Sequence, residues 1–222
     1  MNPIKIKIKT DEYEITQDPK IKLIYTITFE KESKSLIKSL IKSGIIQGAT
    51  IYDDYKSISF KAHTIKPLQE YQKSFSYESA LKLVYNLTNQ LKYLIEEESE
   101  SFYRYTTDNI IVIDNDKFIY LSNENLMKII EKTELIKFVA PFDRDGFVSP
   151  ELLKIKSVPS TVNYRTIYYS LGLLVMDCLF DYQKEDINDK EELLTPIKDT
   201  KLFYLIKRCL HEEPTSRIIV YI

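Results

Sequence analysis

The sequence predicts an α+β fold in which a strand-rich N-terminal part precedes a mainly helical part, and three patterns support this. Apolar and polar residues alternate over residues 4–9, which is typical of a half-buried strand. Residues 77–98 instead repeat apolar side chains at helical spacing. Residues 168–180 are apolar apart from Ser170 and Asp177, which predicts a helix that is buried on every side.

Composition excludes several classes of protein. The 222 residues suffice for one large domain or two small lobes, and 31 basic against 33 acidic residues give nothing global that favours nucleic acid or an anionic membrane. Cys178 and Cys209 lack zinc-type spacing, so we expect two reduced thiols and no metal. With no signal peptide or membrane-spanning segment apparent, we expect an intracellular, cytoplasmic protein with no membrane partner.

The first 66 residues predict four strands and one helix. Residues 4–9 form the first strand, 21–29 the second, and the segment between them turns at Asp18. A helix begins at Ser33 and ends before Gly44, and strands at 49–52 and 56–62 follow as a hairpin. The side chains expected on the inner face of the first strand are Ile4, Ile6 and Ile8.

Beyond Pro67 the pattern becomes helical. The long amphipathic helix over 77–98 is followed by two short strands, at 110–113 and 117–121, and the order of residues 122–148 stays open. A short helix begins at Pro150, which suits the first helical position. The buried helix comes next, and a last helix spans about 201–210. Its expected inward side chains are Leu202, Phe203, Ile206, Cys209 and Leu210.

Four short motifs in this order resemble those of the protein kinase family. They are Asn109 before the apolar Ile110-Ile111-Val112, then Ser149-Pro150-Glu151, then Tyr169-Ser170-Leu171-Gly172, and finally Cys209-Leu210 followed by Pro214-Thr215-Ser216-Arg217. The resemblance covers residues 77–217 well and the first 66 only in outline. It implies a two-lobed kinase-like domain with a reduced strand-rich N-lobe over residues 1–66 and a helical C-lobe over 67–222. In that family the two matching charges pair, so Glu151 and Arg217 are expected to form a structural ion pair.

The chemistry of the family is missing from the matching positions. Phosphoryl transfer needs a phosphate-covering loop, a lysine held by a glutamate and metal-binding carboxylates. No glycine lies between the first two strands, and the helix at 33–43 has only lysines as charged residues. Arg104 stands where the resemblance places the catalytic aspartate. Leu121-Ser122-Asn123 falls where it places Asp-Phe-Gly, so the metal-binding aspartate is absent and Ser122 and Asn123 take the next two positions. Asn109 remains without its partners, and we expect its side chain to bond within its own loop.

These departures predict a catalytically inactive kinase-like protein, a pseudokinase, that acts as a scaffold or regulatory module by binding another protein. Neither a nucleotide nor another cofactor is expected to bind, and nucleic acid is not an expected partner. The residue usage also resembles that of kinase-like proteins of large DNA viruses. Two alternatives stay open: a divergent active serine/threonine kinase with a metal site rearranged around Asp108, Asp114, Asp116 and Glu124, and an unrelated non-enzymatic interaction domain.

Overall fold

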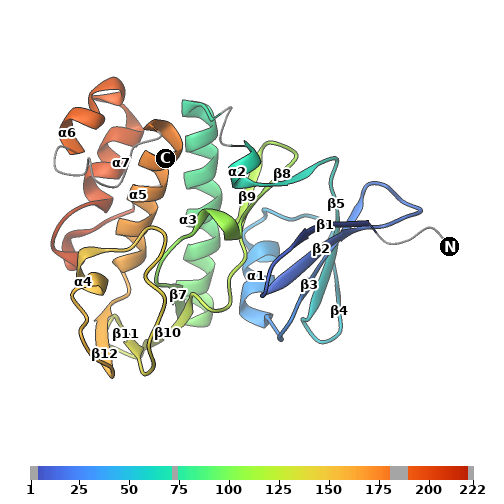
Figure 1. The fold of residues 1–222 in the computed structure, drawn as a ribbon, viewed down its shortest axis with the longest axis horizontal. Helices are drawn as coiled ribbons and strands as arrows, with labels where there is room; N and C mark the ends of the chain where they lie inside the picture. The colour runs from blue at the N-terminus through green and yellow to red at the C-terminus, as the bar shows by residue number, and fades with distance from the viewer. Residues whose placement is uncertain (1–4, 72–74, 181–189, 220–222) are drawn as a thin grey trace.

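The computed structural model describes residues 5–71, 75–180 and 190–219 and has a mixed α+β fold with several antiparallel sheets, as predicted (Figure 1). The first part of the chain contains β1 (Lys5–Lys9), β2 (Tyr13–Gln17), β3 (Ile24–Phe29), α1 (Lys34–Lys42), β4 (Thr50–Tyr52) and β5 (Ser57–Lys61). The middle contains β6 (Ile65–Pro67), α2 (Leu68–Tyr71), α3 (Tyr77–Glu98), β7 (Glu100–Phe102), β8 (Ile110–Ile113), β9 (Lys117–Tyr120), β10 (Leu126–Ile130) and β11 (Leu135–Phe138). The last part contains α4 (Pro150–Leu153), β12 (Ser160–Asn163), α5 (Thr166–Phe180), α6 (Lys190–Leu193) and α7 (Lys201–Cys209).

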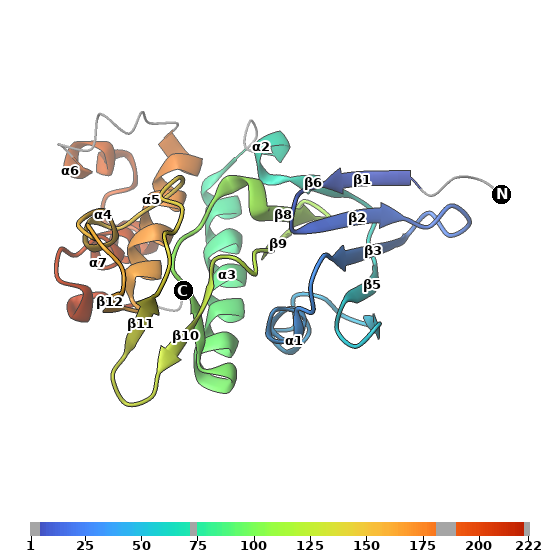
Figure 2. The same cartoon turned by 60° about the horizontal axis from the view of Figure 1, so that its bottom comes forward.

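The first five strands form one antiparallel sheet in the order β1-β2-β3-β5-β4. In Figure 2 the strands β1, β2 and β3 lie side by side, with α1 below β3 and α3 to the left of the sheet. Alternate side chains of the three inner strands are buried against these helices, which is the period of two expected for a sheet with one covered face. These side chains are Tyr13, Ile15, Tyr25, Ile27, Phe29, Ile58 and Phe60.

The predicted inner face of the first strand is wrong at Ile6, whose side chain is 54% exposed. Ile6 pairs with Thr16 and Ile8 with Ile15, so two residues of β1 span one step of β2. This bulge reverses the alternation of side chains and places Ile6 on the open face of the sheet. Ile4 lies outside the described residues.

The connecting segment of the first two predicted strands contains β2, which the sequence pattern did not reveal. The turn at Asp18 is present, because its carboxylate accepts the N–H groups of Lys20 and Ile21. The next strand begins at Ile24 rather than at residue 21. The hairpin formed by β4 and β5 is confirmed, with residues 53–55 in left-handed backbone conformation.

Both helices predicted before residue 100 are confirmed. Helix α3 has the predicted bounds, and the Ser76 hydroxyl accepts the N–H of Ser79 at its start. Ser33 precedes α1 as expected, but its hydroxyl donates to the carbonyl of Lys31 instead of capping the helix. One hydrophobic cluster runs from the N-terminal sheet through α1 and α3 to α5 and α7, which joins the two parts of the chain.

The open segment 122–148 contains the hairpin of β10 and β11. It belongs to a four-stranded sheet of order β12-β11-β10-β7, while β6, β8 and β9 form a three-stranded sheet. A second hydrophobic cluster lies under this hairpin and α4. Its buried members are Tyr103, Ile136, Phe138, Val148, Leu152, Ile155 and Val162.

Helix α5 is buried along most of its length, as its apolar sequence predicts, and α7 packs closely against it. A Cβ atom on Gly172 would lie 2.9 Å from Leu210 Cδ2 and 3.1 Å from Cys209 Cβ, so the two helices approach at this glycine. Phe203 and Leu210 are half-buried rather than fully inward, and Leu205 is buried instead.

Both cysteines, Cys178 and Cys209, are free and buried, and burial raises the pKa of the Cys209 thiol to about 12. Among the described helices, none is long and apolar enough to span a membrane.

The close approach at Gly172 predicts that Gly172→Val destabilises the protein by about 1 to 3 kcal/mol, because the added side chain overlaps Leu210. Urea denaturation measures this. Leu210→Ala in the same chain removes the overlapping atoms, so the double variant is expected to lose less stability than the two single variants added together. Strict additivity would show that the helices do not touch at this position.

Candidate functional site

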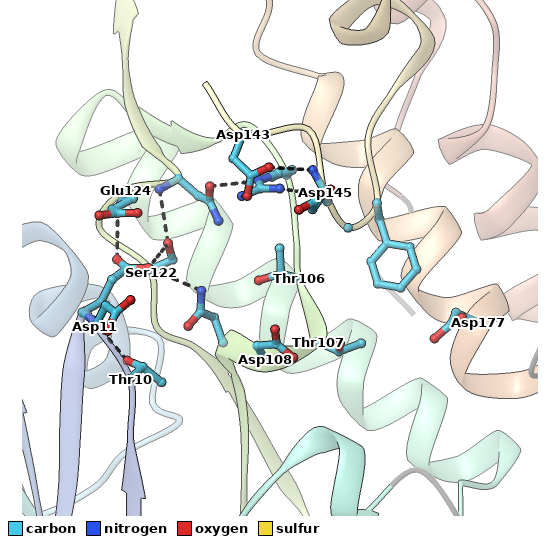
Figure 3. A pocket seen from close by; sticks show the side chains of 16 residues that line it. Thr10, Asp11, Thr106, Thr107, Asp108, Ser122, Glu124, Asp143, Asp145 and Asp177 are labelled. Carbon is cyan, nitrogen blue, oxygen red and sulfur yellow. Dashed lines mark hydrogen bonds and ion pairs between the residues drawn. The ribbon is translucent and has the colours of Figure 1, made fainter. Parts of the chain in front are cut away.

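A cavity with a volume of about 620 Å³ lies where the β1–β2 turn meets the helical part of the chain. Its lining comes from this turn and from residues of the segments 104–109, 122–125 and 143–147, but not from Arg144 (Figure 3). Figure 3 shows Thr10, Asp11 and Ser122 at one end and Asp177 at the other. The cavity therefore joins segments that are more than 100 residues apart in sequence.

The lining of this cavity is strongly acidic. Its carboxylates are those of Asp11, Glu12, Asp108, Glu124, Asp143, Asp145 and Asp177. Among the described residues that line it, Arg104 is the only cationic one, and none is a lysine. Such a surface repels anions and attracts cations that come within about 10 Å, the distance beyond which salt screens the charges.

The Arg104 side chain is buried and holds the 143–147 segment in place. Its guanidinium donates to Asn125 Oδ1 at 3.1 Å, to Asp143 Oδ2 at 2.7 Å and to the carbonyl oxygen of Asp145. Burial lowers the pKa of Arg104, but the hydrogen bond with Asp143 and the nearby charges of Asp143 and the tyrosines Tyr103 and Tyr120 together outweigh this effect, so the net shift is upward. The pKa of Asp143 is lowered by the N–H of Asp145 and by Arg104. Arg104 is therefore a charged structural tie.

The Glu12 carboxylate, at the β1–β2 turn, fills a pocket of hydrogen-bond donors that we call the Glu12 cradle. Ser122 Oγ donates to Glu12 Oε1 at 2.8 Å, and the N–H groups of Asn123 and Glu124 donate to Oε2 at 2.7 and 3.1 Å. Asn109 Nδ2 makes a longer contact of 3.4 Å with Oε1. The cradle thus consists of Asn109, Ser122, Asn123 and Glu124.

The four degenerate positions expected from the sequence, Arg104, Asn109, Ser122 and Asn123, lie around the same cavity or its edge. Three of them contact Glu12, which the sequence reasoning missed. Thr10-Asp11-Glu12 is a short polar stretch, and no local pattern in it signals partners about 100 residues away. The expectation that Asn109 bonds within its own loop is wrong, because its side chain reaches the β1–β2 turn.

Three of the four carboxylates considered for a rearranged metal site have structural partners. Asp108 accepts a hydrogen bond from Gln69, and Asp114 accepts the N–H groups of His63 and Thr64. Asp116 forms an ion pair of 2.7 Å with Lys82. In the described part of the chain, no group of three or more His, Cys, Asp or Glu side chains could hold a metal ion.

Glu151 and Arg217 lie together, away from the cavity. Arg217 has no exposed surface and donates to both carboxylate oxygens of Glu151, to Oε2 at 2.9 Å. Burial raises the pKa of Glu151, but the hydrogen bonds and charge of Arg217, together with bonds from the Glu151 N–H and from Ser149, outweigh burial, so the net shift is downward. The pair ties α4 to the last described segment of the chain.

Neither a scan of protein-family models nor a search of curated proteins finds a match to this sequence. The chemistry of the cavity must therefore be judged from its own residues. Its polar groups include a buried arginine, a buried serine and several carboxylates, and the arginine and the serine bond to other parts of the chain. Side chains engaged in this way hold loops in position.

Replacing Arg104 by methionine keeps much of its apolar stem but removes three hydrogen bonds. We expect a loss of about 1 to 3 kcal/mol and faster hydrogen exchange across residues 143–147, because Arg104 is the tie that holds this segment. Hydrogen exchange with mass spectrometry measures the change. Exposed Arg208→Met is the control and should stay within about 0.5 kcal/mol of the wild type. Unchanged exchange at 143–147 in the Arg104 variant would contradict this role.

Removing the partner of a buried charge is costly, so Arg217→Met is expected to destabilise the protein by about 3 to 5 kcal/mol in urea denaturation. Lys82→Met removes ion pairs with the exposed Glu78 and Asp116 and should cost far less stability, because solvent screens these charges. A similar small loss at Arg217 would show that this pair contributes no more than a surface pair.

The stabilisation by Glu151 should also depend on pH. Its pKa is lower in the folded state than in the unfolded chain, so the contribution is complete above the unfolded value of about 4.3 and is lost as pH falls through the folded value. The stability gap between wild type and Glu151→Gln is therefore expected to be constant near neutral pH and to narrow in acid.

Proposed function

We propose that this chain is a kinase-like domain that has lost phosphoryl transfer and acts as a protein-binding scaffold or regulatory module. The single observation that carries the proposal is the set of hydrogen bonds that the Arg104 side chain forms within the chain. The sequence resemblance aligns this residue with the catalytic aspartate, and its side chain is bonded to Asp143, Asp145 and Asn125. It has no acceptor group with which to receive a proton from a substrate hydroxyl.

The kinase-like part of the proposal is supported by the same motifs that suggested it. Asn109 directly precedes β8, the Pro150-Glu151 pair opens α4, and Arg217 bonds to Glu151 across the fold. The Tyr105 N–H donates to the hydroxyl of Ser170 at 2.7 Å, so α5 holds the loop that contains Arg104. These contacts are the ones expected if the chain keeps the structural ties of a kinase-type site and lacks its reactive groups.

The charge of the cavity supports the absence of nucleotide binding. A nucleoside triphosphate is a polyanion, and the acidic lining offers it a single cation that is already paired with Asp143. Lys31 lines an adjacent small pocket together with Glu30 and Glu12 rather than the main cavity. Electrostatic repulsion therefore opposes entry of the phosphate groups.

We expect no increase in melting temperature when millimolar Mg-ATP is added to the pure protein. A ligand present at 100 times its dissociation constant stabilises by about 2.7 kcal/mol, equivalent to roughly 5 to 10 °C for a chain of this size. Differential scanning fluorimetry measures this, with ATP hydrolysis assayed in parallel. Mg-ADP and Mg-GTP serve as matched ligands.

Two results would favour the competing functions. Hydrolysis of ATP by the pure protein that survives in Arg104→Met would support a divergent active kinase. A nucleotide-dependent rise of several degrees without hydrolysis would retain the scaffold role but add a nucleotide as its regulator.

A further inference from the structure

The Glu12 cradle is built like a binding site for an oxyanion. It offers a buried hydroxyl and two successive backbone N–H groups within 2.7 to 3.1 Å of a carboxylate, with an amide at the edge. Successive N–H groups of a turn that converge on one point form an anion-binding concavity. Hydrogen bonds to an ionised acceptor are stronger than those between neutral groups.

The occupant of the cradle is held in position by its own turn. The Thr10 hydroxyl oxygen accepts the N–H groups of Glu12 and Tyr13, and the Glu12 carbonyl oxygen accepts the N–H of Glu30. The carboxylate is thus tethered to a rigid backbone. A tethered group has a high effective concentration and binds without the loss of freedom that a free ligand incurs.

The surroundings of the cradle favour a tethered carboxylate over a free one. Asp11, Asp108 and Glu124 contribute further carboxylates to the same cavity, and they repel a free anion. A carboxylate that nevertheless sits among them must be held by donors strong enough to overcome this repulsion.

We propose that the Glu12 cradle is an oxyanion-binding site that the chain occupies with its own Glu12, so that external anions are excluded while the β1–β2 turn is in place. The ligand class is a carboxylate or a similarly small oxyanion. The site is independent of the proposed function, because it rests on the hydrogen bonds of Glu12 alone.

Chemical rescue tests the proposal. Glu12→Ala empties the cradle, and we expect its melting temperature to fall by about 5 °C. Sodium acetate should restore part of this loss relative to sodium chloride at equal ionic strength, because acetate supplies the missing carboxylate. Sodium phosphate is a second arm that separates a carboxylate-specific site from a general oxyanion site. In two-dimensional NMR, acetate should shift the amide signals of Asn123 and Glu124.

Asp11→Ala is the matched control, since it removes a carboxylate from the same turn and the same cavity but leaves Glu12 in the cradle. Acetate should affect this variant and the wild type no more than chloride does. Equal effects of acetate and chloride on Glu12→Ala would overturn the proposal.

A second variant, Glu12→Gln, retains the size of the side chain and removes its charge. It shows whether the negative charge of Glu12 raises or lowers the melting temperature. If the cradle binds an anion, the neutral amide lowers the melting temperature. If repulsion from the neighbouring carboxylates dominates, Glu12→Gln melts at or above the wild-type temperature, and the cradle is not an oxyanion site.

Discussion

The fold depends on satisfying a buried charge at Arg217. Its guanidinium is shielded from water, where an unpaired charge would cost several kcal/mol, and it reaches partners on three separate segments. It donates to Glu151 at the start of α4, to the carbonyl oxygens of His211 and Glu212, and at 3.5 Å to that of Arg165 before α5. Those segments can pack only in the one arrangement that brings all these acceptors to one point.

The need to provide hydrogen-bond partners for a charged side chain also shapes the cavity, where the charged groups are Arg104 and Glu12. Arg104 draws the 143–147 segment toward Asn125, and Glu12 draws the β1–β2 turn toward residues 122–124. Arg104 donates several hydrogen bonds to distant segments, and Glu12 accepts several from a distant segment. The hydrophobic cluster holds the sheet and helices together, but these polar contacts set how the loops approach one another over the cavity.

The sequence was most informative where a local pattern decides the structure. Helix α3 and the hairpin of β4 and β5 were predicted because spacing and turn residues act over a few positions. The inner face of β1 was misjudged because a bulge depends on pairing with β2. The resemblance singled out Arg104, Asn109, Ser122 and Asn123 but predicted no cavity there. Glu12 was missed, since nothing near it in sequence indicates a partner at Ser122.

The site also shows why stability and chemistry can be separated in such a fold. Groups that react with a substrate must remain available to it, so an active site keeps polar side chains unsatisfied at a cost in stability. Here Arg104 and Ser122 are buried and bonded to other parts of the same chain, so both side chains serve as structural contacts. Under the proposed function, recovering catalysis would require breaking these contacts as well as supplying carboxylates. A single substitution at Arg104 would remove a tie without creating an enzyme.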